Sequence, residues 1–195
     1  MSKPFEKALR EFDAVNGRDP RTQTVEGKTY PRELIFARQV YAWVERLNPS
    51  ASEEVQLAAR SHTLKRWEIP RSGYGQDTTG YHAWRQATAR HSAKAAEEIL
   101  KRVGYPENRI RRVKQLITWQ LFPRDPDAQL LEDADCLAFL EMKLADYLGQ
   151  WDEAKVRRIL SGTWSKMSEA ARRKASDLPL DPRAKKLLSG LVALP

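Results

Sequence analysis

Two histidines and two aspartates are the residues of this sequence best suited to chemistry. His62 and His91 lie in separate stretches with helical spacing, and Asp133 and Asp135 lie near the start of a third. Imidazole nitrogens and carboxylate oxygens that helix packing brings together can bind a divalent metal ion and so support hydrolysis of a phosphate ester. The sequence therefore predicts a mononuclear metal centre that contains His62, His91 and one of the two aspartates.

The spacing of the aspartates limits their roles. Two positions on a helix diverge by about 200°, so both side chains cannot easily face the same ion. We assign Asp133 as the ligand and Asp135 as a catalytic residue, while the spacing leaves the reverse assignment open. Glu33 is assigned to orient water or to complete the metal shell. The ion could be Mn, Fe, Zn, Ni or Mg; three histidines are too few for a diiron centre with four or more histidine ligands.

A purely structural interpretation accounts for the same residues. Histidines are often half-buried and satisfied by hydrogen bonds, which would explain His62 and His91. The acidic segment around Asp133 would then complement the dipole of a helix N-terminus. His82 precedes His91 by nine positions, which places it about 180° away on a continuous helix, so it is left outside the ligand set.

Basic and aromatic side chains surround the histidines in sequence. Arginine forks bind phosphate in a bidentate manner and aromatic faces stack on bases, so these residues could clamp a nucleotide beside the metal. In the structural interpretation the tryptophans belong to the core, and the arginines pair with Glu68 or Asp77. The residues assigned to substrate binding are Lys65, Arg66, Trp67, Arg71, Tyr81, Trp84, Arg85 and Lys166.

Helical spacing of apolar residues continues along most of the chain and predicts an all-α protein without a sheet. Ser50 and Glu53 read as a capping box, with His62 near the end of the helix that follows. Residues 68–79 are rich in glycine and must form a loop. The expected helices cover residues 4–15, 33–47, 50–62, 81–102, 106–121, 128–148, 155–160, 165–175 and 182–191.

Composition narrows the class of protein. The 195 residues, of which 41% are hydrophobic, suit a single domain over residues 1–195. The chain has no apolar stretch long enough to cross a bilayer and no secretory signal, so we expect a cytoplasmic protein without membrane contact. Its one cysteine, Cys136, reads as a buried thiol. The net charge of +8 favours anionic partners, either a phosphorylated small molecule or nucleic acid. No pattern in the sequence indicates an oligomeric state.

Part of the chain resembles the HD-superfamily phosphohydrolases. In that superfamily a histidine opens a helix, and an Ala-Asp-x-Leu element supplies the last metal ligand; the matching residues are His91 and 134–137. His62 falls where the superfamily has its His-Asp pair, but Thr63 replaces the aspartate, and Glu33 lies near the position of the first histidine. The resemblance implies an HD-like helical bundle over about 29–149, with additional N-terminal helices and a C-terminal helical extension over about 151–195.

Nearly the whole chain is also similar to the domain of unknown function 4202 proteins. That family shares Arg-Trp-x-x-Pro-Arg, Gly-Tyr-x-x-Trp-Arg, Gln-x-Leu-Glu-Asp and Thr-Trp-x-Lys-Met-Ser elements. The corresponding segments of this sequence are 66–71, 80–85, 129–133 and 163–168. This second resemblance identifies a family without implying a reaction.

Two functions follow as hypotheses. The first is a metal-dependent phosphohydrolase in which Arg66, Arg71 and Arg85 neutralise the phosphate of a nucleotide or another small metabolite. The second is a non-catalytic module that binds a nucleotide or RNA on a degenerate HD-like scaffold, with affinity that falls steeply as salt increases. A basic interaction scaffold is a third possibility, since charged faces such as 109–114 are usually solvated.

Overall fold

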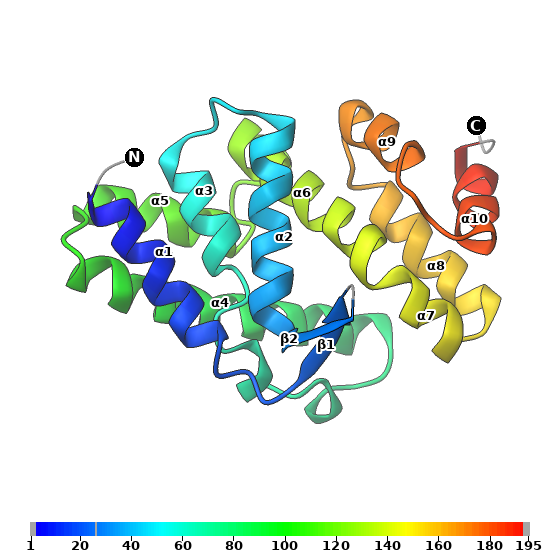
Figure 1. The fold of residues 1–195 in the computed structure, drawn as a ribbon, viewed down its shortest axis with the longest axis horizontal. Helices are drawn as coiled ribbons and strands as arrows, with labels where there is room; N and C mark the ends of the chain where they lie inside the picture. The colour runs from blue at the N-terminus through cyan, green and yellow to red at the C-terminus, as the bar shows by residue number, and fades with distance from the viewer. Residues whose placement is uncertain (1–2, 26, 193–195) are drawn as a thin grey trace.

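The structure is a computed structural model and describes residues 3–25 and 27–192. This part of the chain forms ten α-helices and one small hairpin, so the predicted all-α class is confirmed. Figure 1 shows their arrangement. The elements are α1 (Lys3–Asn16), β1 (Thr22–Val25), β2 (Lys28–Pro31), α2 (Arg32–Leu47), α3 (Glu53–Ser61), the 3-10 turns η1 (Arg66–Glu68) and η2 (Arg71–Gly73), α4 (Thr78–Arg102), α5 (Glu107–Ile117), α6 (Pro126–Met142), α7 (Leu144–Gln150), α8 (Glu153–Trp164), α9 (Glu169–Ser176) and α10 (Pro182–Val192).

Helix α2 is the centre of the packing. It contacts α6 and α3 more extensively than any other element, and Figure 1 shows it upright between the N-terminal helices and the C-terminal ones. Its buried residues Phe36, Val40 and Val44 recur at one-turn spacing, as expected for one face of a helix. They join Leu57 of α3 and Leu137 of α6 in one continuous core. The contact between α3 and α6 brings together the segments that contain His62 and Asp135.

The hairpin corrects the prediction of no sheet. Strands β1 and β2 pair antiparallel, with Gln23 opposite Tyr30, and Gly27 adopts a φ of 76° that suits glycine at the turn. Each strand has only four residues, which alternate weakly in burial, so a period-two pattern was too short to recognise. β2 leads directly into α2, and the hairpin therefore lies at the end of α2 that contains Glu33 (Figure 1).

Several helix boundaries also differ from the expectation, among them the start of α3 and the break between α6 and α7. The cap of α3 is Ser52, whose Oγ accepts from the Val55 amide at 3.3 Å, and not Ser50. The single helix expected over 128–148 is interrupted at Lys143, where φ is −121° and α6 gives way to α7. Lysine is a good helix former, and no proline or glycine adjoins Lys143, so the sequence carries no helix-breaking signal at this position.

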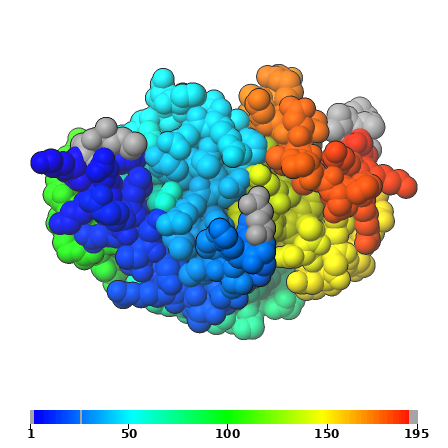
Figure 2. Space-filling view, in the orientation of Figure 1, coloured from blue at the N-terminus to red at the C-terminus, as the bar shows by residue number. Residues whose placement is uncertain are grey.

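The C-terminal helices pack against α6 and against one another. α9 contacts α6, and α10 contacts α7, α8 and α9. Figure 2 shows these helices, yellow to red, beside the blue to cyan N-terminal part of the chain on the same face. Within residues 3–25 and 27–192, no helix combines the length and the apolar character needed to cross a bilayer.

Candidate functional site

His62 and Asp135 are in direct contact. His62 is the C-cap residue of α3, which confirms its predicted place near the end of a helix. Asp135 lies on α6. The two side chains meet with His62 Nε2 and Asp135 Oδ1 3.2 Å apart, and the His62 side chain is 4% exposed. The other ring nitrogen, Nδ1, lies 2.9 Å from the Ala59 carbonyl oxygen. Both nitrogens therefore have fixed partners.

These partners determine how a proton can sit in the pair. A carbonyl oxygen only accepts, so His62 Nδ1 donates a proton to Ala59. Nε2 then meets Asp135 either as a donor from an imidazolium or as an acceptor from a protonated carboxyl. The pair can therefore hold or release a single proton between these two atoms, which is what general acid–base chemistry needs.

The surroundings hold Asp135 in its ionised form. Burial alone would raise the pKa of Asp135, but the hydrogen bond from His62 and the positive charges of His62, Arg85 and Lys166 outweigh it. The pKa of Asp135 consequently lies well below its usual range.

A buried carboxylate holds two of these cations in place. Glu132 is 1% exposed; Arg85 Nη2 lies 2.9 Å from its Oε2, and Lys166 Nζ donates to its Oε1. The Arg85 guanidinium also lies 3.9 Å from the centroid of the Trp119 ring, a cation–π contact. Burial lowers the pKa of Lys166, but Glu132 more than compensates, so the pKa is raised and the ammonium is retained. Glu132 thus positions cations from α4 and the α8–α9 loop beside Asp135.

Lys143 is a buried cation that sequence analysis did not select. Its Nζ lies 3.2 Å from the centroid of the Phe36 ring, and the residue is 8% exposed. Burial lowers its pKa to about 7, although the charges of Glu33 and Asp135 act in the opposite direction and Arg66 adds to the lowering. The Lys143 amine can therefore gain or lose a proton near neutral pH.

Glu33 faces the same region with one oxygen unsatisfied. Its Oε1 accepts from Arg21 Nη2 at 2.8 Å, whereas its Oε2 is buried without a hydrogen-bond partner. Its backbone amide donates to Asp19 at 3.0 Å, so Asp19 caps the start of α2 from the preceding loop. A buried, half-satisfied carboxylate 3% exposed is costly unless another group binds it. Glu33 Oε2 is thus available to orient water or a ligand.

Aromatic residues flank these charges. The Arg66 guanidinium lies 4.7 Å from the centroid of the Trp84 ring, and the Tyr81 and Trp84 rings are 6.1 Å apart. Trp84 Nε1 donates to the Ile69 carbonyl at 2.9 Å, which fixes the ring. Tyr81 is 41% exposed, so its face is open to a ligand. We call His62, Asp135, Glu33, Glu132 and Lys143, together with Arg66, Arg85 and Lys166, the His62 centre.

The other predicted metal ligands have separate partners. His91 Nε2 lies 2.9 Å from Glu68 Oε2 at a partly exposed position. Asp133 accepts from the Ser168 amide at 2.8 Å and from its hydroxyl at 2.6 Å, and so connects α6 to the start of α9. Among the residues that the structure describes, no three His, Cys, Asp or Glu side chains are grouped so that they could hold a metal ion. The structure thus gives His91 and Asp133 partners other than His62, and a metal ion shared by the three stays a prediction.

Three of the predicted substrate-binding residues interact locally instead. Lys65 has a φ of 56° and lies 4.0 Å from Glu68, and Arg71 Nη1 donates to the Tyr74 carbonyl at 3.1 Å. Trp67 is half-buried in η1. Lys65 and Arg71 thus have local partners, whereas Arg66, Arg85 and Lys166 belong to the His62 centre.

A periodic signal could have identified Glu132. Residues three apart share a helix face, so Glu132 and Asp135 are neighbours on α6 while Asp133 points elsewhere. That reasoning selects Glu132 and Asp135 together and separates them from Asp133, which is what the contacts show. No comparable signal marks Lys143, since its burial depends on where α6 ends.

Three comparisons with known proteins bear on the identity of the chain. A family model described as Domain of unknown function (DUF4202) matches residues 6–188, nearly the whole sequence. The search of curated proteins gave no match, and neither did the search of solved structures. The resemblance to the HD superfamily therefore has no support from these comparisons.

Proposed function

We infer, for a chain that belongs to the DUF4202 family, that the His62 centre binds a small phosphorylated molecule and hydrolyses its phosphate ester. One observation carries the proposal: the contact between His62 and Asp135 is surrounded by cationic side chains from separate elements. An acid–base pair beside several positive charges suits an ester of a dianionic phosphate.

Each part of the centre has a chemical role in this proposal. Arg66, Arg85, Lys143 and Lys166 neutralise the phosphate oxygens and the charge that develops on them in the transition state. Water attacks phosphorus as the bond to the ester oxygen breaks. The proton that the His62–Asp135 pair already holds passes to the leaving oxygen through the Asp135 carboxylate, and the pair takes a proton back from the attacking water, so that the protons balance over one turnover.

The aromatic side chains support a nucleotide as one form of the substrate. Tyr81 is exposed, and Trp84 is held beneath the Arg66 guanidinium, so both present faces next to the cations. Base–aromatic stacking tolerates any base, because each base has a π-face. A nucleoside phosphate would place its base on Tyr81 and its phosphate near Arg66.

The test is a screen of phosphorylated metabolites for release of inorganic phosphate by purified protein. We expect His62→Asn to reduce turnover of any active compound by about 100-fold, because it removes the group that transfers the proton. His82→Asn is the matched control, since His82 is exposed and lies outside the His62 centre. Binding of a phosphorylated compound without phosphate release would favour the non-catalytic module, and equal losses in both variants would contradict the proposed site.

The divalent metal ion inferred from the sequence stays a prediction, and elemental analysis tests it. A centre that includes His62 and His91 requires about one bound metal ion per chain, lost in His62→Ala and in His91→Ala alike, because each supplies a ligand. Protein that is metal-free after purification without chelator, yet releases phosphate, would contradict it. Loss of the metal in the His62 variant alone would indicate a different ligand set.

A further inference from the structure

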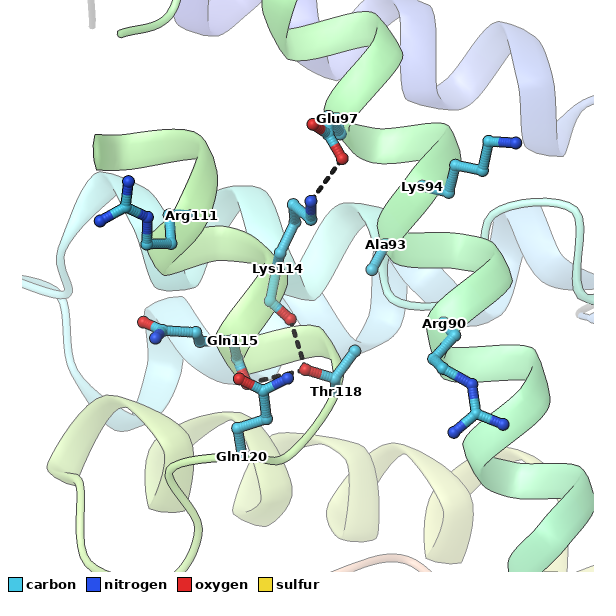
Figure 3. Close-up of a pocket in the computed structure, with 9 residues that line it drawn as sticks. All are labelled: Arg90, Ala93, Lys94, Glu97, Arg111, Lys114, Gln115, Thr118 and Gln120. Atoms are coloured by element: carbon cyan, nitrogen blue, oxygen red, sulfur yellow. Dashed lines mark hydrogen bonds and ion pairs between the residues drawn. The ribbon is translucent and has the colours of Figure 1, made fainter. Parts of the chain in front are cut away.

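An open groove lies between α4 and α5. Its volume is about 660 Å³, within the range of small-molecule sites. Figure 3 shows α4 with Arg90, Ala93 and Lys94 along one side and α5 with Arg111 along the other. None of the residues that line the groove belongs to the His62 centre.

The basic residues of α5 divide into two groups. Arg109 Nε lies 2.5 Å from Glu54, and Arg112 Nη1 lies 2.7 Å from Asp125, so both are engaged with carboxylates of neighbouring elements. Arg111, between them, lines the outer edge of the groove, and its side chain extends away from α4 in Figure 3. The stretch 109–114 is therefore only partly the solvated face that its charge pattern suggests.

The groove collects cations that have no carboxylate partner among the residues the structure describes. Arg90 and Lys94 lie one turn apart on α4, and Arg111 lies across from them on α5. Lys114 reaches across to Glu97, which Lys101 also contacts at 2.8 Å (Figure 3). The single acidic side chain lining the groove is thus shared by two lysines, and the groove retains a positive balance.

The remaining lining is small and polar. Ala93, Gln115, Thr118 and Gln120 complete the surface, and no aromatic side chain lines it. Such a surface offers amide donors and fixed positive charge but nothing on which a base or an apolar chain could stack. Its chemistry therefore selects for negative charge and hydrogen-bond acceptors.

We propose that this groove binds the phosphate chain of a compact polyphosphate, either inorganic triphosphate or the triphosphate of a nucleotide. Arg90, Lys94 and Arg111 extend outward in Figure 3, and on binding these long side chains would turn inward to contact phosphate oxygens, with Gln115 as a further donor. A nucleic acid strand fits less well, because it needs a cationic track that continues along the surface. Here the next cations along α4, Lys101 and Arg102, are engaged with Glu97 and Glu11.

The test uses NMR of the uniformly labelled full chain titrated with inorganic triphosphate at low salt. We expect saturable shifts of the Ala93, Gln115 and Thr118 amides. The variant Arg90→Gln/Arg111→Gln should weaken the affinity derived from these amides by about tenfold, because it removes two charge-assisted contacts. A parallel titration with a nucleoside triphosphate distinguishes the two sources. Tighter binding of the nucleotide than of inorganic triphosphate would show that its base or ribose makes contacts outside the groove.

Two controls separate the groove from general charge and from the proposed function. Arg10→Gln/Arg173→Gln removes the same charge from exposed positions on α1 and α9 and should change the affinity by less than about twofold. His62→Asn should leave the groove shifts intact even if it abolishes phosphate release. Equal weakening in both double variants, or tighter groove binding by a single-stranded oligonucleotide than by triphosphate, would overturn the proposal.

Discussion

Replacing Lys143 by methionine is expected to stabilise the protein far more at pH 6 than at pH 10. Its pKa is about 7 in the folded protein against an ordinary 10.5, so the unfolded chain binds more protons between these values. The free energy of unfolding of the wild-type protein therefore rises with pH across this window, at about 1.4 kcal/mol per pH unit from this one group. Below pH 7 the cost of burying the ammonium is fully present.

Lys143→Met removes this dependence, so the stability gained by the variant should be about 4 kcal/mol larger at pH 6 than at pH 10. The measurement is urea unfolding of both proteins at the two pH values. Lys7→Met, at an exposed position of α1, is the control and should show no such difference. If the free energy of unfolding varied with pH in the same way for Lys143→Met and for the wild-type protein, the Lys143 amine would have an ordinary pKa.

The same variant bears on function. A buried lysine that destabilises the fold is typical of a residue retained for binding or catalysis. We therefore expect Lys143→Met to lose affinity for the phosphorylated compound found in the screen while it gains stability. A variant that is more stable and equally active would show that Lys143 takes no part in binding the substrate.

Replacing Glu132 by glutamine is expected to lower the free energy of unfolding by about 3 kcal/mol. The change keeps the shape of the side chain but removes the negative charge between Arg85 and Lys166, and it leaves two partly buried cations without compensation. Chemical denaturation at pH 7 measures the loss. Glu169→Gln removes an exposed carboxylate that pairs with Arg173 at 3.7 Å and should cost less than about 0.5 kcal/mol.

A double variant tests the explanation if Glu132→Gln folds poorly. Adding Lys166→Met removes one of the two stranded charges, so Glu132→Gln/Lys166→Met should recover part of the lost stability. Residues in one ion-pair network are expected to be non-additive in this way. Additive losses would show that Glu132 acts through packing and not through charge.

Helical periodicity accounts for what the sequence predicted well. The spacing of apolar residues located the helices, and the angular separation of Asp133 and Asp135 correctly implied that they would have different partners. A loop was also expected over 68–79; η2 lies within this range, and α4 begins at Thr78, two residues before its end. These features depend on local geometry, which a sequence specifies directly.

The features that depend on tertiary packing were not accessible in the same way. Whether His91 meets His62 depends on the rotation of α4 against α3, and α4 instead presents His91 to Glu68. Lys143 is buried because α6 ends there and Phe36 of α2 lies beneath it. Neither relation leaves a periodic trace in the sequence, so the type and order of the residues do not predict it.

The small hairpin connects the two ends of the His62 centre. Arg21, just before β1, binds Glu33, and Gln23 within β1 donates to the Met142 carbonyl at 2.9 Å, next to Lys143. A substitution at Arg21 would therefore change how the Glu33 carboxylate is held, and one at Gln23 would remove a contact next to Lys143. Natural variation in this hairpin could thus tune the proton affinity of the buried amine.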